Sequence, residues 1–177
     1  MTALIFLIET VIGFFTILFL LRLYMQVLRV SFLGPIGQFV ITLTNWAVRP
    51  LRRIIPPWGG FDLASLLPAI LLQLGLSILS HILLPRRLFA DDTAMALFFG
   101  TSALLGIVRE SIRLFIGALI VQAVLSWVNP RSPLAAPIHQ FTRPFLDPIR
   151  RILPPISGID LSPLVAIVLA QAILYLL

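Results

Sequence analysis

The sequence is poor in charge and lacks two residue types altogether. Its 177 residues include no cysteine and no lysine, and only 11% are charged. The absence of cysteine excludes disulfides and thiolate metal sites. Because a soluble domain carries roughly 25% charged residues, this chain lacks the polar coat that water requires. Its hydrophobic fraction of 59% indicates that lipid surrounds most of the folded surface.

Long apolar runs occupy much of the chain. Residues 3–21 contain one charged side chain, residues 64–84 none, residues 111–128 one, and the run from residue 162 onward none. A membrane-crossing helix needs about 20 apolar residues to cover about 30 Å of hydrocarbon. The first two runs meet this length outright, and the other two meet it with their flanks. The first run has no basic leading segment and no small-residue cleavage site, so we interpret it as a retained helix.

One polar stretch returns 98 residues later. RRIIPPWGGFDL (52–63) matches RRILPPISGIDL (150–161), and PIGQF (35–39) matches PIHQF (137–141) at an offset of 102. Each copy reads as an apolar helix, a mixed segment, Arg-Arg, Pro-Pro, Gly-x-Asp and a second apolar helix. Self-similarity of this kind indicates a repeat architecture.

These patterns predict an all-α membrane protein built from two tandem parallel repeats of a transmembrane helical hairpin. About four spans and interfacial or re-entrant connector helices are expected. The expected bounds, in chain order, are repeat one at 1–85 (helices at about 3–28 and 62–84, connector 29–61), an inter-repeat segment at 86–109, and repeat two at 110–177 (helices at about 110–128 and 161–177, connector 129–160).

Residues 94–108 leave the topology open, because this apolar stretch is only fifteen residues long and therefore short for a span. An interfacial or re-entrant helix, or an outward extension of the third helix, fits this length. If the stretch crossed the membrane instead, the second repeat would be inverted and Arg150 and Arg151 would face outside.

The arginines orient the hairpins. The two connectors hold eight of them, whereas the loop between the repeats holds only Arg86 and Arg87. Cytoplasmic loops carry the excess of basic residues. We therefore expect a multi-pass protein of the bacterial inner membrane with cytoplasmic connectors and periplasmic termini. Anionic lipid headgroups, rather than nucleic acid, are the expected counter-charge of the net +6.

The connectors differ in their helical pattern. The first has an apolar stripe that predicts an interfacial helix with Trp46 at headgroup depth; the stripe comprises Ile36, Phe39, Val40, Leu43, Trp46 and Ala47. In the second connector, Pro144 and Pro148 interrupt the pattern. Only a short helix, at about 137–143, is expected there.

The repeated motif is the candidate interaction site: Arg52, Arg53, Pro56, Gly60, Asp62, Arg150, Arg151, Pro154, Gly158 and Asp160. In the simpler interpretation the Arg-Arg pairs only fix topology; in the sharper one they bind phosphate or an acidic partner. The prolines favour an extended strut and the glycines permit a turn.

The residues after the turn are expected to start the second helix of each hairpin. Asp62 is predicted to cap the helix that follows it with its carboxylate. In repeat two, Ser162 is predicted to act as the cap, with Pro163 at the first helical position.

Charges inside the apolar runs are expensive and default to functional hypotheses. Arg22 lies near the cytoplasmic end of its helix and is expected to snorkel to the interface. Glu9 lies on the outer side, as do Arg109 and Arg113. We predict an intramembrane ion pair between Glu9 and either Arg113 or Arg109 that joins the repeats; an ion or proton pathway is the alternative.

No catalytic, metal or cofactor site is predicted. Asp62 and Asp160 stand at helix starts, where capping explains them better than acid–base catalysis. His81 and His139 fall on opposite sides of the predicted bilayer, so a shared metal or haem is not expected. Gln73 and Gln171 match across the repeats and are expected to hydrogen-bond between helices.

RPLRRIIPPWGGFDLASLL and SWVNPRSPLAAPIHQFTRPFLDPIRRILPPISGIDLSPL together resemble the YggT/YlmG family of small membrane proteins, over nearly the full chain. Repeat one departs from the pattern at Ala64-Ser65, where repeat two has Ser162-Pro163. The resemblance implies no enzyme activity. It links plastid relatives to cytochrome b maturation and nucleoid distribution, and bacterial relatives to cell division and osmotic tolerance.

The sequence therefore favours a non-enzymatic assembly, scaffold or biogenesis factor that acts through its cytoplasmic connectors. Membrane lipids and either a protein partner or a second copy are the expected partners; no small-molecule substrate, nucleic acid or cofactor is expected. A transport or channel component is the alternative.

Overall fold

The computed structural model describes residues 2–55, 62–83, 91–129, 131–153 and 160–177. In chain order its helices are α1 (Thr2–Val27), α2 (Pro35–Ile54), α3 (Leu63–Leu83), α4 (Asp92–Val128), α5 (Ala135–Ile152) and α6 (Ser162–Leu176). No strand occurs within these ranges. The predicted all-α class is confirmed.

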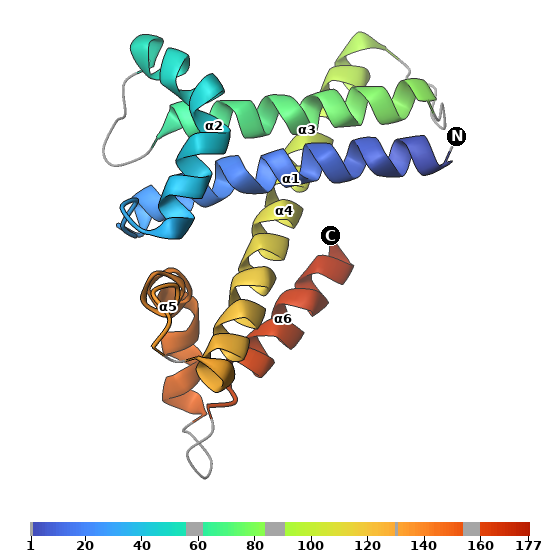
Figure 1. Cartoon of the computed structure of the whole chain (residues 1–177). Coiled ribbons are helices and arrows are strands. Elements are labelled where there is room, and N and C mark those ends of the chain that lie inside the picture. Colours follow the sequence, from blue (N-terminus) through green and yellow to red (C-terminus); the bar gives the residue numbers. More distant parts are fainter. Residues whose placement is uncertain (1, 56–61, 84–90, 130, 154–159) are drawn as a thin grey trace.

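Helices α1 and α3 lie side by side and antiparallel, with the N-terminus near the end of α3 (Figure 1). Both carry large apolar side chains on their outer surfaces, such as Phe6 and Val11 on α1 and Ile82 on α3. By length and composition, Ala3–Val27 and Leu63–Leu83 could each cross a membrane. A helix that is apolar all round belongs in a large core or a bilayer. Because these side chains are exposed, the two helices indicate membrane association.

Helix α4 is 37 residues long, or about 55 Å at 1.5 Å per residue. It begins at a cap in which the Asp91 carboxylate accepts a hydrogen bond from Ala94 N at 2.7 Å. Residues 94–108 therefore belong to one continuous helix with 110–128. Of the alternatives for this stretch, the structure has an extension of the third helix, and this extension packs along α3, with Phe99 against His81 and Gly106 beside Gln73.

Helix α6 lies beside the second half of α4, and α5 lies across the end of this pair (Figure 1). The prediction of a short helix in the second connector is wrong, since α5 continues through Pro144 and Pro148. Both prolines are exposed and lie one turn apart, so the lost N–H donors fall on the outer face. The opposite face buries Ile138 and Leu146, and this packing keeps the helix intact.

The predicted helix of the first connector is present as α2, and the residues of its apolar stripe have two different surroundings. Val40 is buried, but Phe39 and Trp46 are 54% and 68% exposed. The buried face of α2 includes Thr44 and Val48. Because Thr44 is polar, a stripe defined by apolar residues alone does not identify the face of α2 that packs against the protein.

The two connector helices follow one register. At an offset of 98, the buried residues of α2 and α5 coincide as Val40 with Ile138, Thr44 with Thr142, and Val48 with Leu146. The offset of 102 would instead match Phe39, which is exposed, with Phe141, which is buried. The length difference between the copies therefore lies before Val40.

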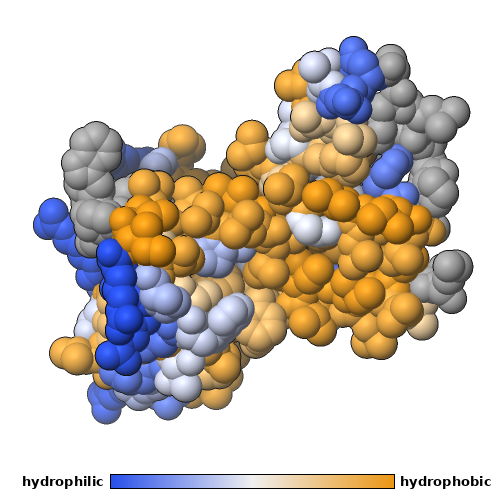
Figure 2. All heavy atoms as spheres, turned by 90° about the horizontal axis from the view of Figure 1, so that it is seen from above, coloured by the Kyte–Doolittle hydropathy of each residue, from blue (hydrophilic) through white to orange (hydrophobic). Residues whose placement is uncertain are grey.

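The hairpins meet where α1 ends. The rings of Tyr24 and Phe141 pack edge to face with centroids 6.2 Å apart, and Gln140 of α5 donates hydrogen bonds to the carbonyls of Leu28 and Arg29. This contact brings α5 to the same end of the molecule as α2. Figure 2 shows hydrophilic residues gathered at that end, an apolar band beyond them, and a second hydrophilic patch near the opposite end.

Candidate functional site

The repeat-one cluster consists of Arg22, Gln26, Thr44, Asn45, Arg52, Asp62 and Ser65. Arg52, in the last turn of α2, places Nη2 2.5 Å from Asp62 Oδ2, and Ser65 Oγ donates to the same oxygen at 2.6 Å. The Asp62 side chain is completely buried, whereas that of Arg52 is 37% exposed. The ion pair therefore ties the end of the connector helix to the start of α3.

Arg22 brings α1 into the same cluster. It is 5% exposed, and its Nη1 donates to Thr44 Oγ1 at 2.6 Å and to Asn45 Oδ1 at 3.1 Å. Arg52 also donates to Gln26 Oε1 at 3.2 Å. The expectation that Arg22 snorkels to the interface is wrong. Because α2 packs over the end of α1, the guanidinium finds its partners inside the protein.

The cluster contains more positive charge than negative charge. Two arginines, Arg22 and Arg52, share one carboxylate, that of Asp62. Within the part of the chain that the structure describes, Arg22 Nε and Asp62 Oδ1 are buried without a hydrogen-bond partner. A buried unsatisfied polar atom costs roughly 1–3 kcal/mol. The cluster is therefore expected to be intolerant of losing any further partner.

Burial, the largest single influence on Asp62, acts to raise the pKa of its carboxyl above the ordinary value of 3.8. Hydrogen bonds from Arg52 and Ser65 and the charges of Arg52 and Arg22 act in the other direction, and they hold the pKa below that value. Asp62 does start α3, but its backbone carbonyl accepts the first helical hydrogen bonds, while its carboxylate binds side chains and not free backbone N–H groups.

The repeat-two cluster consists of Gln122, Thr142, Arg150, Asp160 and Ser162. Arg150 Nη2 lies 2.8 Å from Asp160 Oδ2, and Asp160 Oδ1 accepts a hydrogen bond from Ser162 N at 2.9 Å. The two charged side chains are 29% and 38% exposed. Burial acts to raise the pKa of Asp160, but hydrogen bonds from Ser162 and Arg150 outweigh it and lower the pKa.

The start of α6 corrects the predicted cap. The N-cap residue is Leu161, and Ser162 is the first helical residue rather than the cap. Pro163 lies in the first turn, where its missing N–H costs nothing. Asp160 takes over the capping role that was expected of Ser162, because its carboxylate binds the free Ser162 N–H.

In repeat two, a pair of neutral side chains takes the place that Arg22 and Thr44 have in repeat one. Thr142 Oγ1 hydrogen-bonds to Gln122 Oε1, which joins α5 to α4 as the contact between Thr44 and Arg22 joins α2 to α1. Sequence reasoning did not connect these four residues. The matching threonines at the offset of 98 could have revealed them.

The Arg-Arg motif divides into an inner and an outer residue. Arg52 and Arg150 form the ion pairs, whereas Arg53 and Arg151 are exposed and form no ion pair among the described residues. Adjacent helical residues point about 100° apart, so one member of such a pair faces inward and the other outward. The predicted Pro56, Gly60, Pro154 and Gly158 lie outside the described residues.

The charges within the apolar helices pair differently from the prediction. Arg113 Nη1 lies 2.6 Å from Glu110 Oε1, one turn earlier on α4, and Arg109 donates to the carbonyl of Leu177. Glu9 is exposed on α1 and forms no ion pair within the described ranges. The structure thus does not form the expected pair between Glu9 and Arg113 or Arg109, because α4 supplies its own carboxylate.

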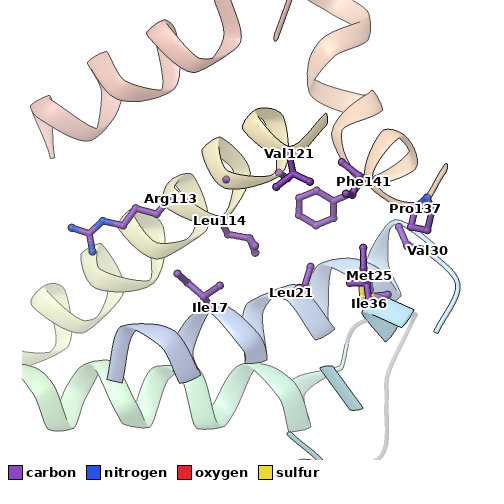
Figure 3. A pocket seen from close by; sticks show the side chains of 13 residues that line it. Ile17, Leu21, Met25, Val30, Ile36, Arg113, Leu114, Val121, Pro137 and Phe141 are labelled. Atoms are coloured by element: carbon purple, nitrogen blue, oxygen red, sulfur yellow. The ribbon is translucent and has the colours of Figure 1, made fainter. Parts of the chain in front are cut away.

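Two apolar cavities flank the contact between α1 and α4. The first, of about 310 Å³, lies between α1, α4 and α5, with Ile17, Leu21 and Phe141 among its walls (Figure 3). Arg113 stands at one end of it and extends away from the other labelled side chains. The second, of about 490 Å³, uses a different face of α4 and is closed on one side by α6.

The described residues contain no group of three or more histidine, aspartate or glutamate side chains that could hold a metal ion. The ring of His81, in the last turn of α3, packs edge-on against Phe99, whereas His139 lies on α5. What the clusters can do is hold the connector helices in place while exposed arginines face outward.

The family model described as CCB3/YggT matches the chain in two segments, residues 1–83 and 101–177. A Vibrio alginolyticus protein, described as an uncharacterised protein in the proC 3′ region, is 39% identical over 93% of this chain and 88% of its own length. The uncharacterised protein YggT of Escherichia coli is 37% identical over 98% and 88%, and an uncharacterised Pseudomonas aeruginosa protein 38% over 93% and 83%. No solved structure matches the chain.

Proposed function

The chain belongs to the CCB3/YggT family, and we propose that it is a non-enzymatic, multi-pass protein of the bacterial inner membrane that serves as a scaffold or biogenesis factor for a protein partner. In this proposal α1, α3, α4 and α6 cross the bilayer as two parallel hairpins. The match of the family model in two segments supports this arrangement.

The observation that carries the proposal is the gathering of both connector helices at one end of the molecule. Gln140 of α5 bonds to the chain at the end of α1, immediately before α2 begins. Exposed arginines from both connectors, including Arg53 and Arg151, lie on these helices, whereas Asp91 and Asp92 lie at the start of α4. Positive charge marks the cytoplasmic side. Both connectors are therefore assigned to the cytoplasm and both termini to the periplasm.

The two arginines of each motif have different tasks in this proposal. Arg52 and Arg150 brace the connectors through Asp62 and Asp160. Arg53 and its counterpart in repeat two present planar guanidinium groups, which suit carboxylate or phosphate groups of a partner.

The topology can be tested first, because the chain has no native cysteine. Single cysteines at exposed Gln38 on α2 and at exposed Ala136 on α5 report the two connectors separately. A membrane-impermeant maleimide should leave both unlabelled in intact cells and label both in inverted vesicles. Labelling of the two positions from opposite faces would refute the parallel hairpins.

The scaffold role requires a partner that binds the exposed arginines Arg53 and Arg151. Arg53→Glu with Arg151→Glu should abolish crosslinking of the partner in native membranes at an unchanged protein level. Arg49→Glu with Arg131→Glu, an equal charge change at exposed connector positions outside the motif, is the control and should retain the partner. Equal loss in both variants would mean that only bulk charge matters, and no loss in either would reject the role.

A further inference from the structure

The lining of the larger cavity is mostly apolar and suits an apolar ligand. Its volume of about 490 Å³ falls in the range of about 300–1,000 Å³ that small-molecule sites occupy. Phe115 and Phe145 form one wall, and Ala166 and Ala170 on α6 form another. These alanines lie one turn apart, and their short side chains leave the space that larger residues would fill.

The few polar groups on the wall are already satisfied. Tyr24 Oη donates to Ser111 Oγ at 2.9 Å, and Ser111 Oγ donates to the carbonyl of Ile107 at 2.7 Å. The wall therefore offers a polar ligand no free donor, and burying such a ligand here would cost its hydrogen bonds to water. A hydrocarbon chain meets no such penalty.

Two arginines follow lining residues of the cavity at one end, and one of them, Arg150, is already paired with Asp160. The cavity lining reaches the connector end at Leu28 and Ile149, and the next residues in sequence are Arg29 and Arg150. Arg29 is exposed and forms no ion pair among the residues described. From Ala166 to Ile173 the lining follows α6 for about 10 Å. This polarity, basic at one end and apolar along the rest, matches an anionic amphiphile.

The smaller cavity does not share this polarity. Arg113 stands at its end away from the connectors, paired with Glu110. An acyl chain entering from the connector side would have to run toward that charge pair. The larger cavity is therefore the better site.

We propose that the cavity between α1, α4, α5 and α6 binds one acyl chain of an anionic phospholipid of the surrounding bilayer, with the headgroup phosphate against Arg29 at the connector end. The lipid would fill the gap between the two hairpins. The proposal rests on the membrane placement in the proposed function, but it does not depend on a protein partner.

The test uses the full chain in bilayers that contain phosphatidylglycerol or phosphatidylcholine with a photoreactive group on the acyl chain. Mapping of the crosslinked peptides should show that phosphatidylglycerol labels the cavity residues Val108, Leu169 and Ile173. A basic residue near an anionic headgroup is worth about 1 kcal/mol, so labelling should exceed that by phosphatidylcholine about fivefold. Flotation of the vesicles reports insertion independently, so failed insertion is distinguished from a failed lipid site.

Variants on one helix provide the controls. Ala170→Phe should fill the groove and remove the labelling, while Ala172→Phe, at an exposed position of α6, should leave it unchanged. If Ala170→Phe fails to insert, Arg29→Gln tests the proposal instead. It should abolish the preference for phosphatidylglycerol without changing the cavity. Equal labelling by both lipids, labelling no stronger than at the exposed Leu164 and Val168, or crosslinks to a second protein chain in the groove would overturn the proposal.

Discussion

Arg22 and Gln122 stand at matching places in the two repeats, each against a threonine of the connector helix, but only one of them is charged. Around Arg22 the carboxylate of Asp62 is fully buried. Around Gln122 the corresponding Asp160 is 38% exposed and also serves as a helix cap. The same motif therefore has a fully buried carboxylate in repeat one and a partly exposed carboxylate in repeat two, while both arginines are partly exposed.

The difference teaches that the repeated residues do not carry equal energy. A buried ion pair is destabilised strongly when one partner is removed, by about 3–5 kcal/mol. A surface pair contributes about 0–1 kcal/mol. Repeat one is therefore expected to depend more on its ion pair, and repeat two, with neutral Gln122, is expected to lose its pair and still fold.

The largest effect is expected from removing the two aspartates in turn. Asp62→Ala leaves Arg22 and Arg52 without their carboxylate and should destabilise the protein by about 3 kcal/mol. Asp160→Ala removes an exposed pair and one cap and should cost about 1 kcal/mol. The midpoint of unfolding in mixed micelles, followed by circular dichroism, measures both. Equal losses would mean that the two clusters are energetically equivalent.

Acid should weaken repeat one through the same carboxylate. Because the pKa of Asp62 is lowered in the folded protein, its contribution is fully present above the ordinary value of 3.8 and is lost as the pH falls through the lower folded value. Stability should therefore drop below about pH 4 in the parent protein. Asp62→Asn should flatten this part of the profile, and a profile of unchanged steepness would exclude Asp62 as its source.

A double-mutant cycle sharpens the comparison further. Arg22→Gln gives repeat one the residue of repeat two and removes charged hydrogen bonds to Thr44 and Asn45, so it should cost about 2 kcal/mol. Combined with Asp62→Asn, it should show a coupling of about 1 kcal/mol, because the two side chains belong to one network. Gln122→Leu with Asp160→Asn should show none. If the effects of Arg22→Gln and Asp62→Asn were strictly additive, the two side chains would not belong to one network and the two repeats would not differ in this respect.

The helices of the hairpins could be predicted because their signal is strong and local. Runs such as 3–21 and 64–84 have a composition that only a membrane or a large core accommodates, and α1 and α3 end within a residue or so of the expected bounds. The continuity of α4 was less visible, since an apolar stretch of fifteen residues fits several arrangements.

The errors arose where tertiary packing overrides a local rule. Pro144 and Pro148 are helix breakers in isolation, but α5 tolerates them because its other face is buried. Arg22 has the position of a snorkelling residue and is instead buried, because α2 folds over it. Neither outcome is encoded in the neighbouring sequence, since each depends on an element that arrives from elsewhere in the chain.

The smallest effect is expected at the matched glutamines of α3 and α6. Gln73 is buried and donates to Thr16 Oγ1 at 3.1 Å, and it lies so close to α4 that a Cβ on Gly106 would fall 2.2 Å from its Oε1. Gln171 is exposed. Since hydrogen bonds between membrane helices are worth about 0.6 kcal/mol on average, Gln73→Leu should lower the unfolding free energy by about that amount, and Gln171→Leu should leave it unchanged.

Gly106→Ala provides an independent reading of the same contact, because the added methyl group displaces the Gln73 amide without altering Gln73 itself. If Gln73→Leu is made in the Gly106→Ala background, its own cost should disappear, since the bond to Thr16 is already lost there. A cost that persists in this background would assign the role of Gln73 to packing. In that case the matched glutamines would no longer distinguish a polar contact in repeat one from its absence in repeat two.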